Sequence, residues 1–271
     1  MGVTTDRRQI VRYLDGVGDE RSDSVAVESP LTIVLDDDVL VTTMRTPGHD
    51  LDLAAGWLVN ESGVCRSDHI ASMGAFASRN DDDVDTVRVQ LAAGVEPPRP
   101  RAFVTNSACG VCSADILAGV RPPDGPLHSP DWTLTAVDVV PLLDQMRSRQ
   151  RTFDRTGALH AAALVGPAGD LLWVREDVGR HNAVDKAVGR ALFDDLLPLT
   201  DHVLLVSGRV SYEIVHKALT AGVAAIAAVS GPTTLAVDLS RQHDLVLIGF
   251  AREGRLNVYS GAARVPEGES A

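Results

Sequence analysis

Two cysteines, Cys109 and Cys112, are separated by two residues, a spacing at which their sulfurs can act together. The apolar run 101–105 precedes them, and the helix-like segment 113–119 follows. We therefore expect the pair where a strand gives way to a helix. Unpaired backbone N–H groups and the positive end of the helix dipole favour the thiolate there. The two sulfurs can form a disulfide, share a metal ion or pass a sulfur atom to a substrate.

The CxxC spacing alone does not distinguish among these three functions. A zinc site needs about four ligands, but the chain has no second CxxC, and its third cysteine, Cys65, falls in a different predicted domain. We expect Cys65 to be a part-buried, small apolar residue. Thioredoxin-like exchange fits a CxxC between a strand and a helix, although the surrounding segments lack that fold's order. In a sulfur relay, a thiolate accepts a sulfur atom as a persulfide and hands it on.

A second set of polar residues follows the strands predicted in the C-terminal half, at 175–182, 207–211, 230–234 and 250–255. Ligands bind outside the carboxyl ends of the strands in α/β sheets, and Gly, Arg and helix N-termini suit phosphate. None of these loops is a Walker A loop or a G-x-G-x-x-G motif, which argues against ordinary NTPase and Rossmann sites. They predict a rim for a phosphorylated or nucleotide-like ligand, formed by His181, Arg175, Arg180, Arg209, Arg252 and Arg255.

Lysine is rare, because the chain contains only Lys186 and Lys217, each just after a group of polar residues. We predict a point-charge ammonium at a ligand site, with two solvated helix lysines as the alternative. Lys186 is expected in the first turn of a helix beginning near Ala183, where a cation opposes the helix dipole. A residue placed against local preference suggests ligand binding, so we place Lys186 on the rim beside Arg180 and His181. The alternative is a salt bridge from Lys186 to Asp185, Asp177 or Glu176.

Strands and helices alternate after residue 159. Apolar runs predict strands at 161–165, 171–174, 202–206, 224–229, 245–248 and 256–259. Helical periodicity predicts helices at 137–149, 183–193, 212–219 and 234–242. This alternation is typical of an α/β layer sandwich with a partly parallel sheet.

The N-terminal part has a different pattern. Residues 1–24 are polar without a sustained period, so we predict a flexible tail. A strand hairpin over 31–44, a helix that stops at Gly63, and strands at 72–79 and 86–91 predict a small α+β unit. The proline-rich segment 96–100 marks the boundary, since proline is excluded from sheet interiors. The predicted chain is thus α/β, with a tail (1–24), a smaller N-terminal α+β domain (25–100) and a larger C-terminal α/β domain (101–271).

The amino-acid composition and net charge argue against several classes of protein. The 271 residues are 45% hydrophobic and 23% charged, which is ordinary for a globular protein. The net charge of −12 argues against a nucleic-acid surface, and an anionic ligand must be bound by local basic residues. No run approaches the roughly 20 apolar residues of a membrane span, and no N-terminal apolar stretch indicates a secretory signal. We expect a cytoplasmic protein that binds neither nucleic acid nor membrane.

Several segments of the chain resemble the formate dehydrogenase accessory protein family, FdhD. They are residues 106–112, 156–162, 176–186, 207–213, 231–233 and 249–255, and the likeness runs from about residue 28 to 260. The string Glu-Asp-Val-Gly-Arg-His-Asn at 176–182 is long and highly specific. One departure is Ser113 after the second cysteine, where we expect glycine in many relatives. Serine there favours capping of the next helix.

The resemblance implies a sulfur carrier, a sulfurtransferase-type protein rather than a metabolic enzyme. Such proteins accept persulfide sulfur from a cysteine desulfurase. They transfer it to the molybdenum cofactor, in its bis(molybdopterin guanine dinucleotide) form, before insertion into formate dehydrogenase. By motif match, Cys109 is the persulfide intermediate and Cys112 its partner. The residues expected to bind the cofactor are Phe250, Ala251, Arg252, Glu253, Gly254, Arg255, Arg180, His181, Lys186 and Arg209.

The cofactor is then a bound client, so we expect no permanent cofactor and no metal ligand in the protein, and we expect a homodimer. The resemblance also implies that the larger domain is similar to the cytidine-deaminase fold. Deaminase chemistry is not expected, because Ala161 and Ala162 follow His160 and leave no glutamate as general acid/base. The competing function is a chaperone that only holds the cofactor, with its cysteines closing a disulfide or a zinc site. The sequence names neither the formate dehydrogenase served nor the metal, molybdenum or tungsten.

Overall fold

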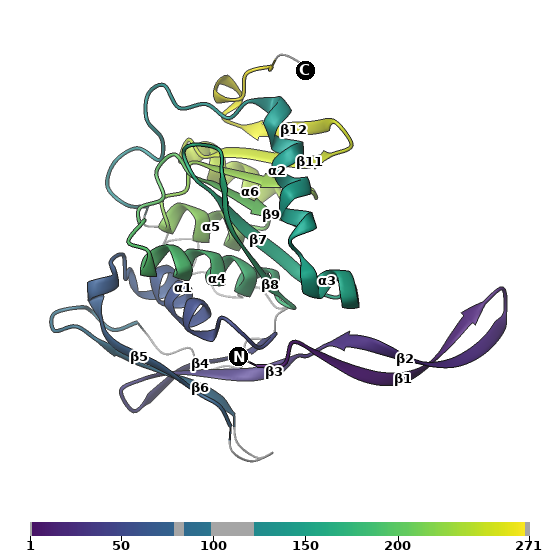
Figure 1. The fold of residues 1–271 in the computed structure, drawn as a ribbon. Helices are drawn as coiled ribbons and strands as arrows, with labels where there is room; N and C mark the ends of the chain where they lie inside the picture. The colour runs from purple at the N-terminus through teal and green to yellow at the C-terminus, as the bar shows by residue number, and fades with distance from the viewer. Residues whose placement is uncertain (1, 79–83, 99–121, 269–271) are drawn as a thin grey trace.

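The computed structural model describes residues 2–78, 84–98 and 122–268. Within these residues, the protein is a mixed α/β structure with a larger sheet, a smaller sheet and a separate hairpin. Helices lie against both faces of the larger sheet and between the two sheets (Figure 1). The α/β class predicted from the alternating pattern is confirmed.

The larger sheet has its described strands in the order β12-β11-β10-β9-β7-β8. Strands β9, β10 and β11 are parallel, whereas β7 is antiparallel to both β8 and β9, and β12 is antiparallel to β11. The strands predicted after residue 159 are confirmed, and the sheet is partly parallel, as expected. Their bounds are β7 (His160–Val165), β8 (Leu171–Asp177), β9 (Val203–Val206), β10 (Ala225–Ala228), β11 (Val246–Arg252) and β12 (Arg255–Ser260).

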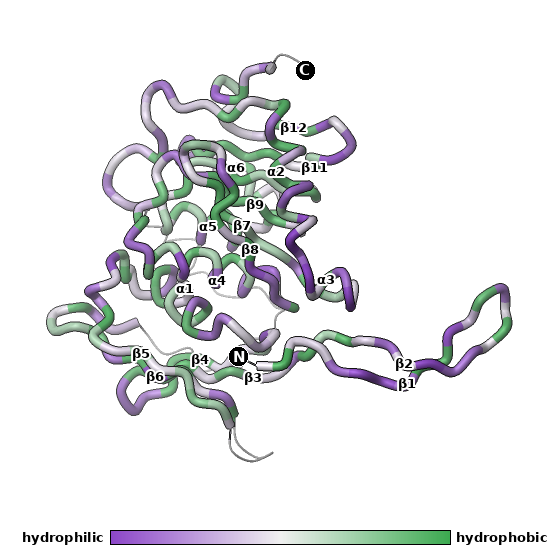
Figure 2. The backbone as a smooth tube through the Cα atoms, in the orientation of Figure 1, coloured by the Kyte–Doolittle hydropathy of each residue, from purple (hydrophilic) through white to green (hydrophobic). Residues whose placement is uncertain are grey.

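Helices cover the larger sheet because its strands are apolar on both faces. In β7, Ala162 and Leu164 join the core beneath α4, while Ala161, Ala163 and Val165 join the core beneath α2, as alternating side chains of a strand must. Figure 2 shows these central strands as hydrophobic. One face carries α4 (Arg180–Phe193), α5 (Tyr212–Thr220) and α6 (Thr234–Gln242), and the other carries α2 (Ala136–Ser148).

These helices agree with the periodicity of the sequence, but the short helix α3 (Arg151–Thr156) was not predicted. Single 3-10 turns also occur at η1 (Ser67–His69) and η3 (Ala262–Arg264). In the described part of the chain, no helix has the length and apolar character needed to cross a membrane.

The N-terminal part forms the smaller sheet and one helix, which the sequence predicts. Helix α1 (Asp50–Ser62) lies between this sheet and α4, and residues 52–60 of α1 are all buried. It ends at Gly63, whose φ of 71° suits glycine at a helix C-terminus. The sheet has the order β4-β3-β6-β5, with β3 (Ser29–Leu35), β4 (Asp38–Arg45), β5 (Ile70–Phe76) and β6 (Asp85–Leu91).

A single hydrophobic core joins the two parts. Leu31 and Ile33 of the smaller sheet, Leu58 of α1, Val184 of α4 and Leu204 of the larger sheet belong to the same buried cluster. The division into domains near residue 100 stays a prediction, and residues 99–121 lie outside those described.

The N-terminal tail predicted as flexible instead contains a regular hairpin. Strands β1 (Thr5–Leu14) and β2 (Val17–Ala26) pair antiparallel over their full length and project from the body (Figure 1). The turn is Asp15-Gly16, with φ values of 49° and 83°, and Asp-Gly is a strong signal for such a turn. Arg12 lies opposite Asp19, and Arg8 lies opposite Asp23. Opposite charges in this register favour a polar hairpin, and the ion pairs formed are Arg8–Asp6 and Arg21–Asp19 within the strands. Polarity alone was therefore a poor guide.

Candidate functional site

The loops that follow β8, β9, β10 and β11 lie at one edge of the larger sheet. These strands run in the same direction, so their carboxyl ends meet there, and the antiparallel strands β7 and β12 begin there. Val210 N–H donates to Gly231 O at 3.3 Å, and Phe250 N–H donates to Ser230 O at 3.2 Å, so backbone hydrogen bonds join the loops. We call this edge the rim and define it by residues 178–182, 207–211, 230–234 and 250–255.

Residues 250–255 form the end of a hairpin rather than the open loop expected after residue 248. Strand β11 continues to Arg252, and β12 begins at Arg255. Glu253 and Gly254 make the turn, with φ values of 53° and 72°, the left-handed pair typical of a tight hairpin. Arg255 lies 3.5 Å from Glu253, and both side chains are exposed. The hairpin therefore holds Arg252 and Arg255 in fixed register across two strands.

A glycine brings two of the loops together beneath Phe250. A Cβ atom on Gly231 would lie 2.6 Å from the tip of the Phe250 ring, so a larger residue at position 231 would require the ring to move. Phe250 has a φ of 52° and is 40% exposed. The tip of its ring therefore lies against Gly231 in the loop after β10, while the side chain stays partly exposed.

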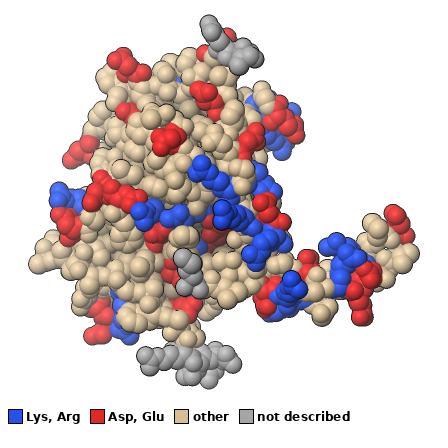
Figure 3. Space-filling model, viewed as in Figure 1, with Lys and Arg blue, Asp and Glu red and all other residues tan. Residues whose placement is uncertain are grey.

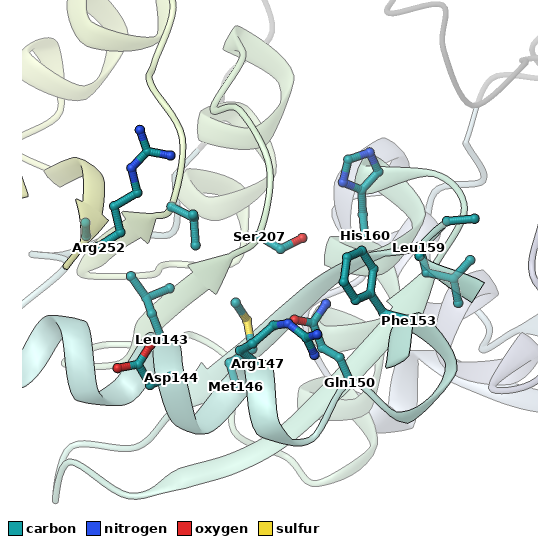
Figure 4. Close-up of a pocket in the computed structure, with 14 residues that line it drawn as sticks. Leu143, Asp144, Met146, Arg147, Gln150, Phe153, Leu159, His160, Ser207 and Arg252 are labelled. Atoms are coloured by element: carbon teal, nitrogen blue, oxygen red, sulfur yellow. The ribbon is translucent and has the colours of Figure 1, made fainter. Parts of the chain in front are cut away.

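A pocket of about 480 Å³ opens beside the rim, on the face of the sheet that carries α2. Figure 4 shows side chains from α2, α3, the start of β7 and the end of β11 around it. Its apolar wall includes Leu143, Met146, Phe153, Leu159, Val229 and Ala251, and its polar groups are Asp144, Arg147, Gln150, His160, Ser207 and Arg252. An apolar wall with a few convergent polar groups is typical of a ligand site.

Two arginines, Arg147 and Arg252, line this pocket together with the acidic Asp144. Arg147 forms an ion pair with Asp154 at 2.6 Å and lies over the Phe153 ring, 4.6 Å from its centre. Figure 3 shows basic side chains gathered in a band across the middle of one face, at the level of α3 in Figure 1. An acidic protein thus presents local positive charge here, which is what an anionic ligand requires.

Arg180, His181 and Arg209 lie on the rim, close to His160. Electrostatic interactions reach His160 from all three residues. His181 is held in place, because its Nε2 lies 2.8 Å from Glu213 Oε2 and 3.4 Å from Ser211 Oγ. Among the described residues, neither Arg180 nor Arg209 forms an ion pair, and the buried Arg180 Nε has no hydrogen-bond partner. The guanidinium groups of Arg180 and Arg209 can therefore bind an anionic ligand.

Lys186 does not reach the rim. Helix α4 begins at Arg180, so Lys186 lies in its second turn rather than its first. Its side chain is 1% exposed, and its Nζ lies 2.7 Å from Asp177 Oδ2. It also donates a hydrogen bond to Thr46 O at 2.9 Å. The salt-bridge alternative is therefore correct and the rim placement of Lys186 is wrong, because burial leaves the ammonium no path to a ligand.

Lys217 and Arg175 are likewise bound inside the protein. Lys217 Nζ lies 2.7 Å from Asp185 Oδ1, so neither lysine is a solvated helix residue. Arg175 Nη2 lies 2.8 Å from Asp52 Oδ2 of α1, with both side chains largely buried. Burial tends to raise the pKa of Asp52, but His49 and Arg175 outweigh it and hold that pKa below its ordinary value. Arg175, expected on the rim, instead ties β8 to α1.

The pocket residues of α2, of α3 and of the turn between them, such as Arg147, Phe153 and Gln150, were not predicted from the sequence. The candidate residues were all sought in loops after strands, whereas the connection from α3 leads into the amino end of β7. Because β7 is antiparallel to β9, that amino end lies at the same edge as the loops. The antiparallel direction of β7 could not be predicted from the sequence, and without it these residues could not be placed at the site.

Of the three cysteines, only Cys65 lies among the residues that the structure describes. Cys109 and Cys112, predicted as the reactive pair, lie outside the described residues. Cys65 is exposed rather than part-buried, because it follows the end of α1 instead of packing beneath it. Within the described ranges, no group of His, Cys, Asp and Glu side chains has the arrangement needed to hold a metal ion.

Comparisons with known proteins match nearly the whole chain. The model of the FdhD/NarQ family matches residues 26–266. A Streptomyces coelicolor protein named sulfur carrier protein FdhD is 46% identical over 273 residues, covering 98% of this chain and 97% of that one. A Mycobacterium tuberculosis protein of the same name is 40% identical over 275 residues, covering 98% of this chain and 100% of that one.

A solved structure shares the fold. It is described as a putative formate dehydrogenase accessory protein from Desulfotalea psychrophila, and it superposes with a TM-score of 0.78 at 21% identity. The match covers 97% of this chain and 100% of that chain. The arrangement of sheets and helices described above is therefore shared with that protein.

Proposed function

Because the chain belongs to the FdhD/NarQ family, we propose that it is a sulfur carrier that serves a formate dehydrogenase. The observation that carries the proposal is the likeness to proteins named sulfur carrier protein FdhD over 98% of the chain. In finer detail, the protein accepts persulfide sulfur from a cysteine desulfurase. It transfers the sulfur to the bis(molybdopterin guanine dinucleotide) form of the molybdenum cofactor before insertion into the enzyme.

The first step of the proposal is an exchange at sulfur. The Cys109 thiolate attacks the outer sulfur of the desulfurase persulfide, a new S–S bond forms, and the desulfurase cysteine leaves as a thiolate. One S–S bond replaces another, so nothing is oxidised or reduced overall. Cys112 is the neighbouring thiol of the pair. Local sequence supports this role, since the helix predicted over 113–119 would favour the thiolate of a cysteine placed before it.

The rim and the pocket are the proposed site for the client cofactor. Its guanine nucleotide arms carry phosphates, which suit the guanidinium groups of Arg252, Arg180 and Arg209. An aromatic ring of such a ligand suits the apolar wall that includes Phe153 and Leu159. The unsatisfied Arg180 Nε supports an anionic partner at this edge. These groups bind and orient the client, and they exclude water from the part that enters the pocket.

The sulfur step is tested by mass spectrometry after incubation with a cysteine desulfurase and cysteine. The wild-type protein is expected to gain the mass of one sulfur atom, located on Cys109 by peptide mapping. Cys109→Ala is expected to lose this gain, and Cys65→Ala is the control that retains it. If Cys112→Ala loses the gain while Cys109→Ala keeps it, the two roles are reversed. If no variant gains sulfur, the competing function of a cofactor-holding chaperone is favoured.

The ligand step is tested with GDP as a probe for the nucleotide arms. Arg252→Ala combined with Arg255→Ala is expected to weaken GDP binding at least tenfold, about 1.4 kcal/mol. Arg252 lines the pocket, so most of the loss is expected from Arg252→Ala alone. Arg88→Ala, an exposed arginine on β6, is the matched control and is expected to bind normally. Unchanged affinity in the double variant contradicts the placement of the nucleotide at this hairpin.

Several finer expectations stay predictions of this proposal. They are a homodimeric state, a cytoplasmic location and similarity of the larger sheet and its helices to the cytidine-deaminase fold. Direct association with a cysteine desulfurase is a further prediction.

A further inference from the structure

His160 stands where the pocket meets the rim. It is the first residue of β7, and it lines the pocket together with Leu159 and Ser207. It also lies close to the next residue of the loop after β9, where a Cβ atom on Gly208 would lie 3.2 Å from His160 Nδ1 and 4.0 Å from Arg180 Cδ. The loop is pinned beside it, because Ala161 N–H donates to Ser207 Oγ at 2.8 Å. The imidazole is therefore near both the pocket and Arg180, and a ligand that contacts both would lie beside it.

The charged groups around His160 are mostly positive. Asp177 is its cross-strand partner on β8, but that carboxylate is already paired with Lys186. The His181 imidazole is paired with Glu213 of α5. The other ionisable or charged groups that face His160 or share its pocket are Arg180 of α4, Arg209 of the loop after β9, Arg147 and Asp144 of α2, and Arg252 of β11.

These surroundings keep the imidazole neutral in the free protein. Burial lowers the pKa of His160 below its ordinary value, and the charges of Arg180, His181 and Arg209 lower it further, while Asp177 acts in the opposite direction. A bound polyanion reverses this balance. It offsets the field of the arginines, and it accepts a hydrogen bond from the protonated ring, and both effects favour the charged form.

We infer that His160 is a proton-exchanging residue of this site, which takes up a proton when a phosphate-bearing ligand binds and gives it up when the ligand leaves. The inference rests on the proposed function in needing an anionic ligand at the rim. It adds a titrating residue to a site otherwise built on arginine, whose charge does not change near neutral pH. Binding coupled to proton uptake weakens as the pH rises between the free and the bound pKa of His160.

The test combines calorimetry with NMR on the full chain. GDP and inorganic pyrophosphate are titrated into wild-type protein in buffers of different ionisation enthalpy. The expected result is net proton uptake and an affinity that falls with rising pH. His160→Gln is expected to abolish the uptake and the pH dependence while it still binds the anion. His243→Gln is the control, because His243 follows the end of α6, at the opposite edge of the sheet.

NMR titration of the histidine rings measures the pKa of His160 directly, with and without a bound anion. The pKa of His160 in the free protein is expected below its ordinary value, rising in Arg180→Gln and rising on addition of pyrophosphate. A free-state pKa at or above the ordinary value overturns the inference, and so does anion binding without proton uptake. Failure of GDP alone to bind contradicts the proposed nucleotide site, and the inference is then judged on pyrophosphate. Failure of both anions overturns it as well.

Discussion

At the scale of single residues, one carboxylate holds several segments of the molecule together. Asp177, fully buried at the end of β8, forms the ion pair with Lys186. It also accepts backbone hydrogen bonds from Gly179 at 2.8 Å and Thr46 at 3.2 Å. Asn182 donates to it as well, at 3.1 Å. These partners compensate the buried charge of Asp177. Removing the positive charge of Lys186 would leave the carboxylate buried without a counter-charge, which is strongly unfavourable.

Replacing Lys186 by methionine is therefore expected to destabilise the protein strongly. Lys186→Met keeps the apolar length of the side chain but leaves the Asp177 carboxylate buried without a counter-charge. The expected loss in the free energy of unfolding is about 3–5 kcal/mol. The measurement is urea unfolding followed by circular dichroism.

The control for this experiment lies on the same helix. Arg190 and Asp194 form an exposed i,i+4 pair on α4, and such surface pairs contribute little. Arg190→Gln is thus expected to leave the unfolding midpoint almost unchanged. A stable Lys186→Met protein with impaired ligand binding would reinstate Lys186 as a ligand residue.

The roles of Lys186 and Arg175 were not predictable from local sequence. A polar residue at a strand end or in a helix is compatible with a ligand and with a buried ion pair. For Arg175 the choice depends on Asp52, which is far away in the chain. For Lys186 the partner Asp177 is near in sequence and was considered, but the burial of the pair depends on the packing of the whole fold. Arg180 and His181, by contrast, were correctly placed near a helix start at the sheet edge, since that position depends only on the order of strand, loop and helix.

At the scale of the elements, helices α1 and α4 cross with their backbones in close contact. A Cβ atom on Gly56 would lie 1.9 Å from Asp185 O, and one on Gly189 would lie 1.8 Å from Asp52 O. Both obstacles are backbone atoms of the other helix, which cannot rotate away. The two glycines thus allow the helix backbones to touch, and this brings Asn60 of α1 within 2.7 Å of Asp185.

Replacing either glycine by alanine is expected to destabilise the protein. Alanine is the better helix former by about 1 kcal/mol, so the substitution would raise stability if the helices had room. With the clash, Gly189→Ala is expected to lower the free energy of unfolding by about 3 kcal/mol or more. Thermal and urea unfolding of Gly56→Ala and Gly189→Ala measure this directly. An increase in stability for either variant would contradict the crossing described here.

Strands and helices after residue 159 were predictable because each has a regular apolar pattern. Hairpin β1–β2 and helix α3 were not. The hairpin has little apolar patterning, and its signal is confined to Asp15-Gly16 and to cross-strand charges. Helix α3 spans only Arg151–Thr156, too short for a period to develop. Its start is held from outside, because Glu176 accepts hydrogen bonds from the backbone of Thr152 and Phe153 at 3.0 and 2.8 Å.

At the scale of the whole molecule, the two sheets share one core. The sequence predicts two domains because proline interrupts the chain near residue 100, and local pattern holds no information on what packs across such a break. The structure shows α1 buried on both sides, against the smaller sheet and against α4. Neither part keeps its apolar surface covered without the other.

Helix α4 begins at the rim with Arg180 and His181 and continues into the crossing with α1. A ligand held by Arg180 binds the folded form of this helix and so stabilises it by linkage. Because α1 cannot leave α4 without exposing Asp185 and its partners, that stabilisation extends to residues the ligand never touches. Ligand binding at the rim is thus expected to slow the exchange of the buried amide hydrogens of α1, the neighbouring helix, with solvent.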